Sequence, residues 1–281
     1  MPASSPRTPS YRLHRPSGQA VVTLWDLVTG SARPVTWIDG QQVNLRPLMP
    51  GGRGGATGIN NRGKIVGGSE KQLTSGATVG RATLWFGSKV KDLGALTDDG
   101  QSSANAINDD GVIVGTAGAV GGALVPVRWV DGQISALGFA AGTIAVPEDV
   151  NRPGVIVGHA FYGDGLPHAY AWQGDAHFEM GSLAGYPRSA AASINADGVA
   201  VGYGMTADRK GVALMWTSLL GQPVDLNTLV DAGGCVDAFG EKRKLTSAEG
   251  INDKGMIVAT ADANVGGNAR QFAFILKPVA P

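Results

Sequence analysis

The chain has 281 residues, and its 23 Lys plus Arg balance its 23 Asp plus Glu, so the formal net charge is zero. This balance leaves no long-range field to attract nucleic acid or an anionic membrane surface. The single cysteine, Cys235, excludes an intramolecular disulfide framework, and no apolar run approaches the roughly 18 residues of a membrane-spanning helix. We therefore expect neither a nucleic-acid partner nor a membrane partner.

The first ten residues, MPASSPRTPS, form a Pro/Ser-rich stretch without the apolar segment of a secretory signal. We predict a flexible arm over 1–10 and a single domain over 11–281. The missing signal favours the cytoplasm, although a trimmed secreted form would look the same.

A strand–turn–strand motif recurs along the chain, most clearly as ANAINDDGVIVGT over Ala104–Thr116. A degenerate copy opens the chain at Tyr11–Val22, with His14 in place of the central asparagine. Repetition near 45 residues is typical of a repeat architecture. The asparagines of the clear copies are Asn60, Asn108, Asn151, Asn195 and Asn252.

The motif is explained by turn chemistry. The asparagine side chain can cap its own turn, and the glycine three residues later supplies the positive φ that a turn with a G1 bulge requires. The following Ile-Val-Gly run is typical of a buried strand. We therefore assign these residues to structure and not to an active site.

Two further strands follow each hairpin. The third strand ends in an aromatic residue, and the fourth follows a short polar turn. Four antiparallel strands every 45 residues predict an all-β, single β-propeller of four-stranded blades. Strand counts favour six blades over five; the sixth repeat lacks an outer strand after Gln271–Leu276, and a five-bladed ring results if the first repeat completes the last. The third strands end at Trp37, Trp85, Trp129, Trp172, Trp216 and Phe274.

The hairpins, the His168-Ala169-Tyr170 strand and the Asp92-Leu93-Gly94 strand resemble the bacterial HAF repeat, named after its His-Ala-Phe triplet. The likeness covers nearly the whole chain after about residue 10. It implies a propeller and an extracellular repeat protein, and it transfers no catalytic residues.

We expect function on the face that carries the loops between second and third strands and between blades, because these differ in length. They include the loops at Ser69–Gly80 and Gly158–Pro167. The longest insertion, Val230–Ser247, is a candidate lid or partner loop.

Inner strands crowd towards a propeller axis, so small residues are the rule there, and three carboxylates break it. Glu148, Asp149 and Glu249 are our candidate catalytic residues, as general acids or bases. The structural alternative is that they line a wet channel and hydrogen-bond to neighbouring strands. Asn105 occupies the same column as Glu148 and is a candidate ligand contact.

Other ligand-contact candidates lie on the loops. His159 and Tyr162 begin one loop; Arg53, Tyr186 and Arg188 are fixed donors for a carboxylate or enolate, and Phe239 offers an apolar surface. The spacing of the histidines argues against a metal site.

We predict a monomer that binds a small organic molecule in a central funnel. Without a nucleotide or metal motif, the chemistry expected is cofactor-independent acid–base catalysis by a cyclase, lyase or isomerase of small-molecule biosynthesis. The alternative is a non-catalytic extracellular or envelope module that binds a protein or a glycan.

Overall fold

The structure is a computed structural model that describes residues 11–13, 20–26, 31–139, 144–231, 234–265 and 267–279. The predicted arm and His14 lie outside these residues. The chain divides into two compact units, Met1–Ala136 and Leu137–Pro281. Strands form nearly all of the regular structure, and the described residues contain no α-helix.

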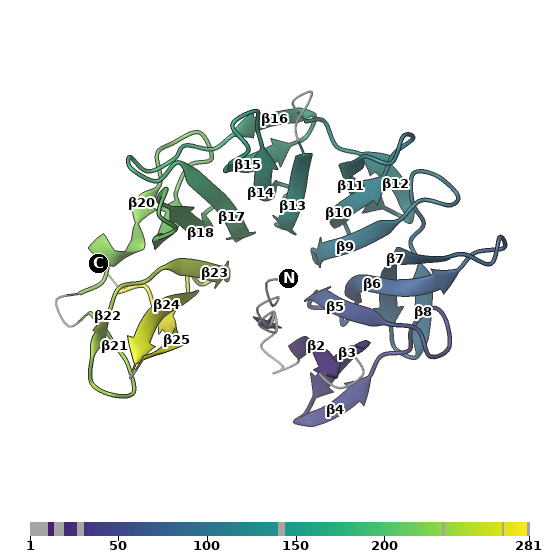
Figure 1. The fold of residues 1–281 in the computed structure, drawn as a ribbon, viewed down its shortest axis with the longest axis horizontal. Coiled ribbons are helices and arrows are strands. Elements are labelled where there is room, and N and C mark those ends of the chain that lie inside the picture. Colours follow the sequence, from purple (N-terminus) through teal and green to yellow (C-terminus); the bar gives the residue numbers. More distant parts are fainter. Residues whose placement is uncertain are drawn as a thin grey trace. The chain divides into compact units, whose positions relative to one another are not determined.

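The first unit consists of three four-stranded antiparallel sheets (Figure 1), in which strands adjacent in sequence are adjacent in the sheet. The strands are β1 (Tyr11–Leu13), β2 (Ala20–Asp26), β3 (Ser31–Ile38), β4 (Gln41–Asn44), β5 (Gly54–Ile59), β6 (Ile65–Gln72), β7 (Thr78–Phe86), β8 (Lys89–Asp92), β9 (Ser102–Ile107), β10 (Ile113–Gly118), β11 (Leu124–Val130) and β12 (Gln133–Ala136).

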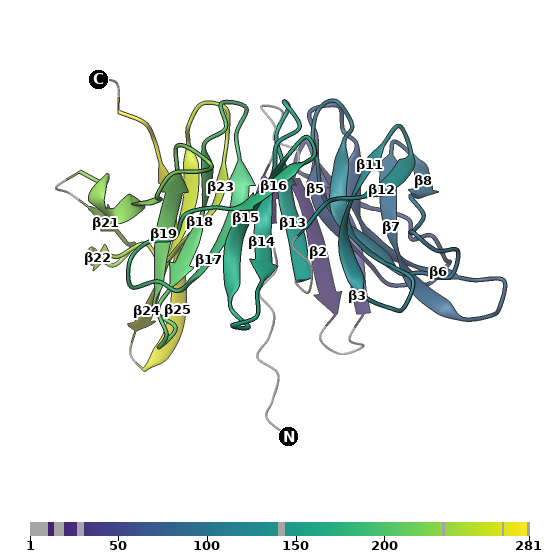
Figure 2. The ribbon, with the colours of Figure 1, turned by 90° about the horizontal axis from the view of Figure 1, so that it is seen from above.

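The second unit has two four-stranded sheets, one three-stranded sheet and a small hairpin that lies beside β24 and β25 (Figures 1 and 2). Its elements are β13 (Ile144–Val150), β14 (Ile156–Phe161), β15 (Pro167–Gln173), β16 (Ala176–Glu179), β17 (Arg188–Ile194), β18 (Ala200–Met205), β19 (Gly211–Trp216), β20 (Val224–Asp225), the 3-10 helix η1 (Leu226–Thr228), β21 (Cys235–Val236), β22 (Lys242–Arg243), β23 (Ser247–Ile251), β24 (Ile257–Val265) and β25 (Asn268–Leu276).

These sheets confirm the predicted four-strand repeat and six blade sheets in place of five. The degenerate first copy builds a sheet of its own, because β1 pairs with β2 through Tyr11 and Val22. The last repeat has three strands among the described residues, β23, β24 and β25, as its sequence predicted.

The repeated asparagine caps its turn as predicted. The Asn60 side-chain oxygen accepts hydrogen bonds from the backbone N–H groups of Arg62 and Lys64, both at 3.0 Å. Gly63, three residues on, has a φ of 74°. The asparagine has a second role that the motif did not reveal: its Nδ2 donates to the carbonyl of Asn108 in the next sheet, at 2.9 Å. The asparagines therefore also join neighbouring sheets.

Tryptophans that end third strands form a second link between sheets. The Trp129 indole donates from Nε1 to the carbonyl of Leu93 at 2.9 Å, and Trp216 donates to that of Gly181 at 2.8 Å. Trp216 is fully buried, among residues of both sheets that include Met180 and Leu214. The sixth copy has Phe274, which has no such donor.

A β-bulge interrupts the first strand of five repeats, where one extra residue stands between two paired residues. In β13 the register shifts between Pro147 and Asp149, so Glu148 is the extra residue. The residue opposite the bulge is glycine in four of the five repeats, and a Cβ on Gly158 would lie 2.0 Å from the carbonyl oxygen of Val146. In the fifth repeat Ala259 occupies this position, so the bulge favours glycine but forms with alanine there.

The expectation of variable loops between second and third strands is wrong. In four sheets these connections are five-residue turns with one hydrogen-bond pattern, as in Leu73 N to Ala77 O at 2.8 Å. The strands extend into the segments expected to be loops, because their backbone groups pair as far as Gln72 with Thr78. The last sheet differs, because β24 ends at Val265 and β25 begins at Asn268, which leaves a shorter turn.

Candidate functional site

The bulges of the second unit present two of the predicted carboxylates. Glu148 is the extra residue of β13, and Glu249 is the extra residue of β23, between Ala248 and Gly250. Bulges redirect a side chain without breaking the sheet, and they occur often beside active sites. The predicted column of inner-strand carboxylates is thus a column of bulge residues.

Glu148 lies beside His159, which comes from the neighbouring strand β14. Oε1 of Glu148 is 3.6 Å from Nδ1 of His159, and the two side chains are 31% and 18% exposed. Burial lowers the pKa of His159 below its usual 6.5 even with this carboxylate nearby. The imidazole is therefore neutral near pH 7 and has a free lone pair for a proton. Among the described residues, its buried Nδ1 has no hydrogen-bond partner.

Tyr203 of β18 connects the two carboxylates electrostatically. Burial raises the pKa of Tyr203 above its usual 10.0, and the negative charges of Glu148 and then Glu249 raise it further. The phenol is therefore protonated at neutral pH and is a hydrogen-bond donor. Both carboxylates act on one hydroxyl group, although one repeat lies between theirs in the sequence.

Glu249 has a neighbour of its own. The Thr260 hydroxyl of β24 donates to Oε1 of Glu249 at 3.4 Å. Thr260 is buried while Glu249 is exposed. Glu148, His159, Tyr203, Glu249 and Thr260 are called the bulge cluster below.

The structure gives Asp149 a different environment. Its Oδ2 accepts from the Ser193 hydroxyl at 2.7 Å and from the backbone N–H of Ile194 at 3.1 Å, both in β17. Its Oδ1 accepts from the N–H of Val150 at 2.9 Å, and the residue is buried. These bonds fix β13 to β17, which is the structural alternative for an inner-strand carboxylate.

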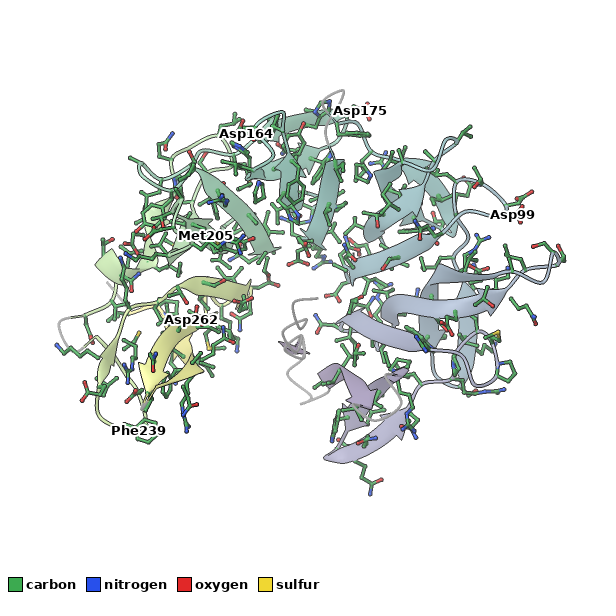
Figure 3. All side chains as sticks on the ribbon, in the orientation of Figure 1. Asp99, Asp164, Asp175, Met205, Phe239 and Asp262 are labelled. Atoms are coloured by element: carbon green, nitrogen blue, oxygen red, sulfur yellow. The ribbon has the colours of Figure 1, made fainter. Side chains whose placement is uncertain are left out.

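The remaining ligand-contact candidates of the second unit do not join the cluster. Tyr162 packs against the His168 ring, with 5.1 Å between centroids. Arg188 donates to the carbonyl of Thr206 at 3.0 Å, and Tyr186 packs on the core between two sheets. Phe239 is exposed at the periphery of this unit (Figure 3) and contacts the Phe272 ring edge-on.

Two candidates belong to the first unit. Asn105 is the bulge residue of β9, so it is the structural counterpart of Glu148 there. The backbone of Arg53 pairs with Glu70: the Arg53 N–H donates to Oε2 of Glu70 at 2.9 Å. In the first unit, Asn105 therefore marks a bulge and Arg53 makes a loop contact.

Sequence reasoning missed Tyr203 and Thr260. They occupy the fourth position of the Ile-Val-Gly strand, the same position as His159. This second-strand column reads Gly68, Thr116, His159, Tyr203 and Thr260. The larger polar residues in this column all belong to the second unit. This pattern in the sequence could have identified Tyr203 and Thr260.

The bulge cluster combines a neutral imidazole, a protonated phenol and two carboxylates. An imidazole beside a carboxylate is an arrangement for a general base, and a phenol can donate to a developing oxyanion. Catalytic hydrogen bonds are often long in the absence of substrate, so a 3.6 Å separation of Glu148 and His159 suits such a pair. The arrangement can support proton transfer on a bound molecule.

The described residues contain neither a metal-binding group nor a membrane-spanning helix. No group of three or more His, Cys, Asp or Glu side chains is arranged to hold a metal ion. No helix in the described part of the chain is long and apolar enough to cross a membrane.

The fold is similar to known structures. TolB from Acinetobacter baumannii matches with a TM-score of 0.56 at 13% sequence identity, over 92% of this chain and 61% of TolB. Pyrococcus horikoshii acylaminoacyl peptidase matches with a TM-score of 0.55 at 11% identity, over 97% of this chain and 45% of the peptidase. A fungal lectin from Aleuria aurantia, described as a six-bladed β-propeller, gives a TM-score of 0.47 at 14% identity, over 91% and 86% of the chains.

These identities establish similarity of fold alone. Together with the strand order of the sheets, they define an all-β protein of the β-propeller class with six blade sheets. The chain spans about half of the length of the first two proteins. No family model and no curated protein matches the sequence, so the resemblance to HAF repeats stays a prediction.

Proposed function

We propose that the chain binds a small organic molecule at the bulge cluster and catalyses proton transfer on it. The observation that carries this proposal is the convergence of Glu148, His159 and Tyr203, with both bulge carboxylates acting on the Tyr203 hydroxyl. Titratable groups with shifted pKa values gather at functional sites more often than elsewhere. The reaction class is that of a cyclase, lyase or isomerase.

The roles follow from the protonation states. Neutral His159 accepts a proton from a carbon next to a substrate carbonyl, and Glu148 stabilises the imidazolium that results. The Tyr203 phenol donates to the carbonyl oxygen as negative charge develops on it. Returning the proton to another carbon gives isomerisation. Loss of a β-substituent that takes the proton from the imidazolium gives a lyase reaction. Attack of the enolate on a second carbonyl closes a ring, and the imidazolium returns its proton to the new alkoxide.

Native mass spectrometry tests the proposal. The purified protein is incubated with a metabolite extract from its source, in parallel with Glu148→Gln, Glu249→Gln and His159→Gln. Exposed Glu241→Gln in the insertion is the matched control. We expect one discrete adduct, with an occupancy at least tenfold lower in the Glu148 and Glu249 variants and unchanged in the control.

The same samples separate binding from catalysis. We expect His159→Gln to retain the adduct and to convert it about 10²–10⁴-fold more slowly, the usual contribution of a general base. An adduct that all four variants bind equally would contradict the proposed site. Binding without conversion by the unmodified protein would contradict catalysis and support the non-catalytic module.

A further inference from the structure

A cavity of about 830 Å³ lies within the second unit, at the turn ends of the sheets β17–β20 and β23–β25. The turns at Asn195–Val199 and Asp253–Gly255 contribute to its wall. So do Leu226, Leu229, β21 and the end of β25, while no member of the bulge cluster does. The cavity is open to solvent on one side, because its lining includes the exposed residues Val236, Ile275 and Val279.

The cavity coincides with a break in the repeat. Where the preceding two sheets meet, the Trp216 indole fills the interface and donates to the carbonyl of Gly181. At the cavity the residue equivalent to Trp216 is Phe274. The segment after β20 forms the 3-10 helix η1. The interface therefore has neither the indole nor the carbonyl contact that seals its neighbour.

The wall combines apolar side chains with exposed charged ones. Met215, Ile251, Ile257, Phe274 and Leu276 come from the sheets, Leu226 comes from η1, and the exposed Leu229 follows η1. Asp197, Asp231, Asp253, Lys254 and Lys277 are exposed lining residues with charges of both signs. A cavity of several hundred Å³ with an apolar wall and a few polar groups is typical of a small-molecule site.

We propose that this cavity is a second ligand site, specific for a planar, uncharged aromatic molecule. The neighbouring interface holds the two-ring indole of Trp216, whereas here the smaller single ring of Phe274 stands at that position and lines the cavity, so a planar ligand ring can occupy the space beside it. Because the exposed wall carries charges of both signs, it favours a ligand that has no net charge. The site is independent of the bulge cluster.

The neutral fluorophore 1-N-phenylnaphthylamine, whose aromatic rings carry one N–H group, tests the site. We expect a saturable fluorescence increase with one molecule bound per chain. Leu229→Lys places a charge in the wall at a residue that is 57% exposed, and we expect at least a tenfold weaker affinity. Leu220→Lys is the matched control, because Leu220 is 76% exposed and outside the cavity.

A second readout uses Cys235, the single cysteine of the chain, which is buried in the cavity wall. The fluorophore should slow its alkylation by N-ethylmaleimide, and Phe274→Trp should weaken this protection by restoring the indole. Glu148→Gln should leave both readouts unchanged, which separates this site from the proposed catalytic one. Equal fluorophore affinity in Leu229→Lys and Leu220→Lys, or no protection of Cys235, would overturn the proposal.

Discussion

Gly158→Ala is expected to lower the free energy of unfolding by about 1–3 kcal/mol, the usual range for overpacking a well-packed site. The added Cβ would lie 2.0 Å from the Val146 carbonyl and 3.0 Å from the Glu148 N–H. Both neighbours are backbone, so the bulge itself must move. Urea unfolding followed by circular dichroism measures the loss.

The matched control is Gly163→Ala, where the added Cβ meets no atom within 4 Å. We expect the control to remain within about 0.5 kcal/mol of the unmodified protein, as for most surface substitutions. Gly202→Ala should behave like Gly158→Ala, because its Cβ would lie 2.0 Å from the Ala190 carbonyl. Equal stability of Gly158→Ala and Gly163→Ala would show that the bulge does not require glycine.

Trp216→Ala is expected to lower the free energy of unfolding by about 3–5 kcal/mol, the usual cost of removing a buried aromatic side chain. Trp216 is fully buried between two sheets, and its truncation also leaves the Gly181 carbonyl without its indole donor. Thermal unfolding and urea titration both report the change.

Two further variants separate packing from hydrogen bonding. Trp216→Phe keeps an aromatic ring but loses the indole N–H donor. We expect it to lower the free energy of unfolding by about 1–3 kcal/mol, the cost of leaving a buried polar group unsatisfied. Phe86→Ala removes an aromatic side chain that is 53% exposed and should have little effect. If Trp216→Phe matched the unmodified protein, the indole bond would not hold the sheets together.

Much of the fold could be predicted because its signals are local. The asparagine and glycine of each turn determine the hairpin, and alternating strands and turns determine the sheet order. The prediction about the second-to-third connections failed because the sequence of Gly158–Pro167 is rich in glycine and polar residues, although its outer residues pair as strand. Pairing with the neighbouring strand determines how far these strands extend, and such pairing cannot be recognised from the local sequence.

The candidate site could be predicted in part. Glu148 and Glu249 stood out because carboxylates are unexpected in a crowded inner strand. Their relation to Tyr203 depends on bulges and on contacts between sheets, which sequence comparison within one strand does not show. The same reason explains Asp149: its partners Ser193 and Ile194 lie in another repeat.

In the proposed site both bulge carboxylates act on the Tyr203 phenol, so the titration of this phenol tests the site. Ring-labelled tyrosine gives five NMR signals, and Tyr203→Phe identifies the relevant one. We expect a pKa above 10.0 that falls in Glu148→Gln and falls again when Glu249→Gln is added, with part of the rise remaining because burial is its largest cause. Glu241→Gln should not change it. An identical Tyr203 titration in the double variant and the unmodified protein would contradict the account.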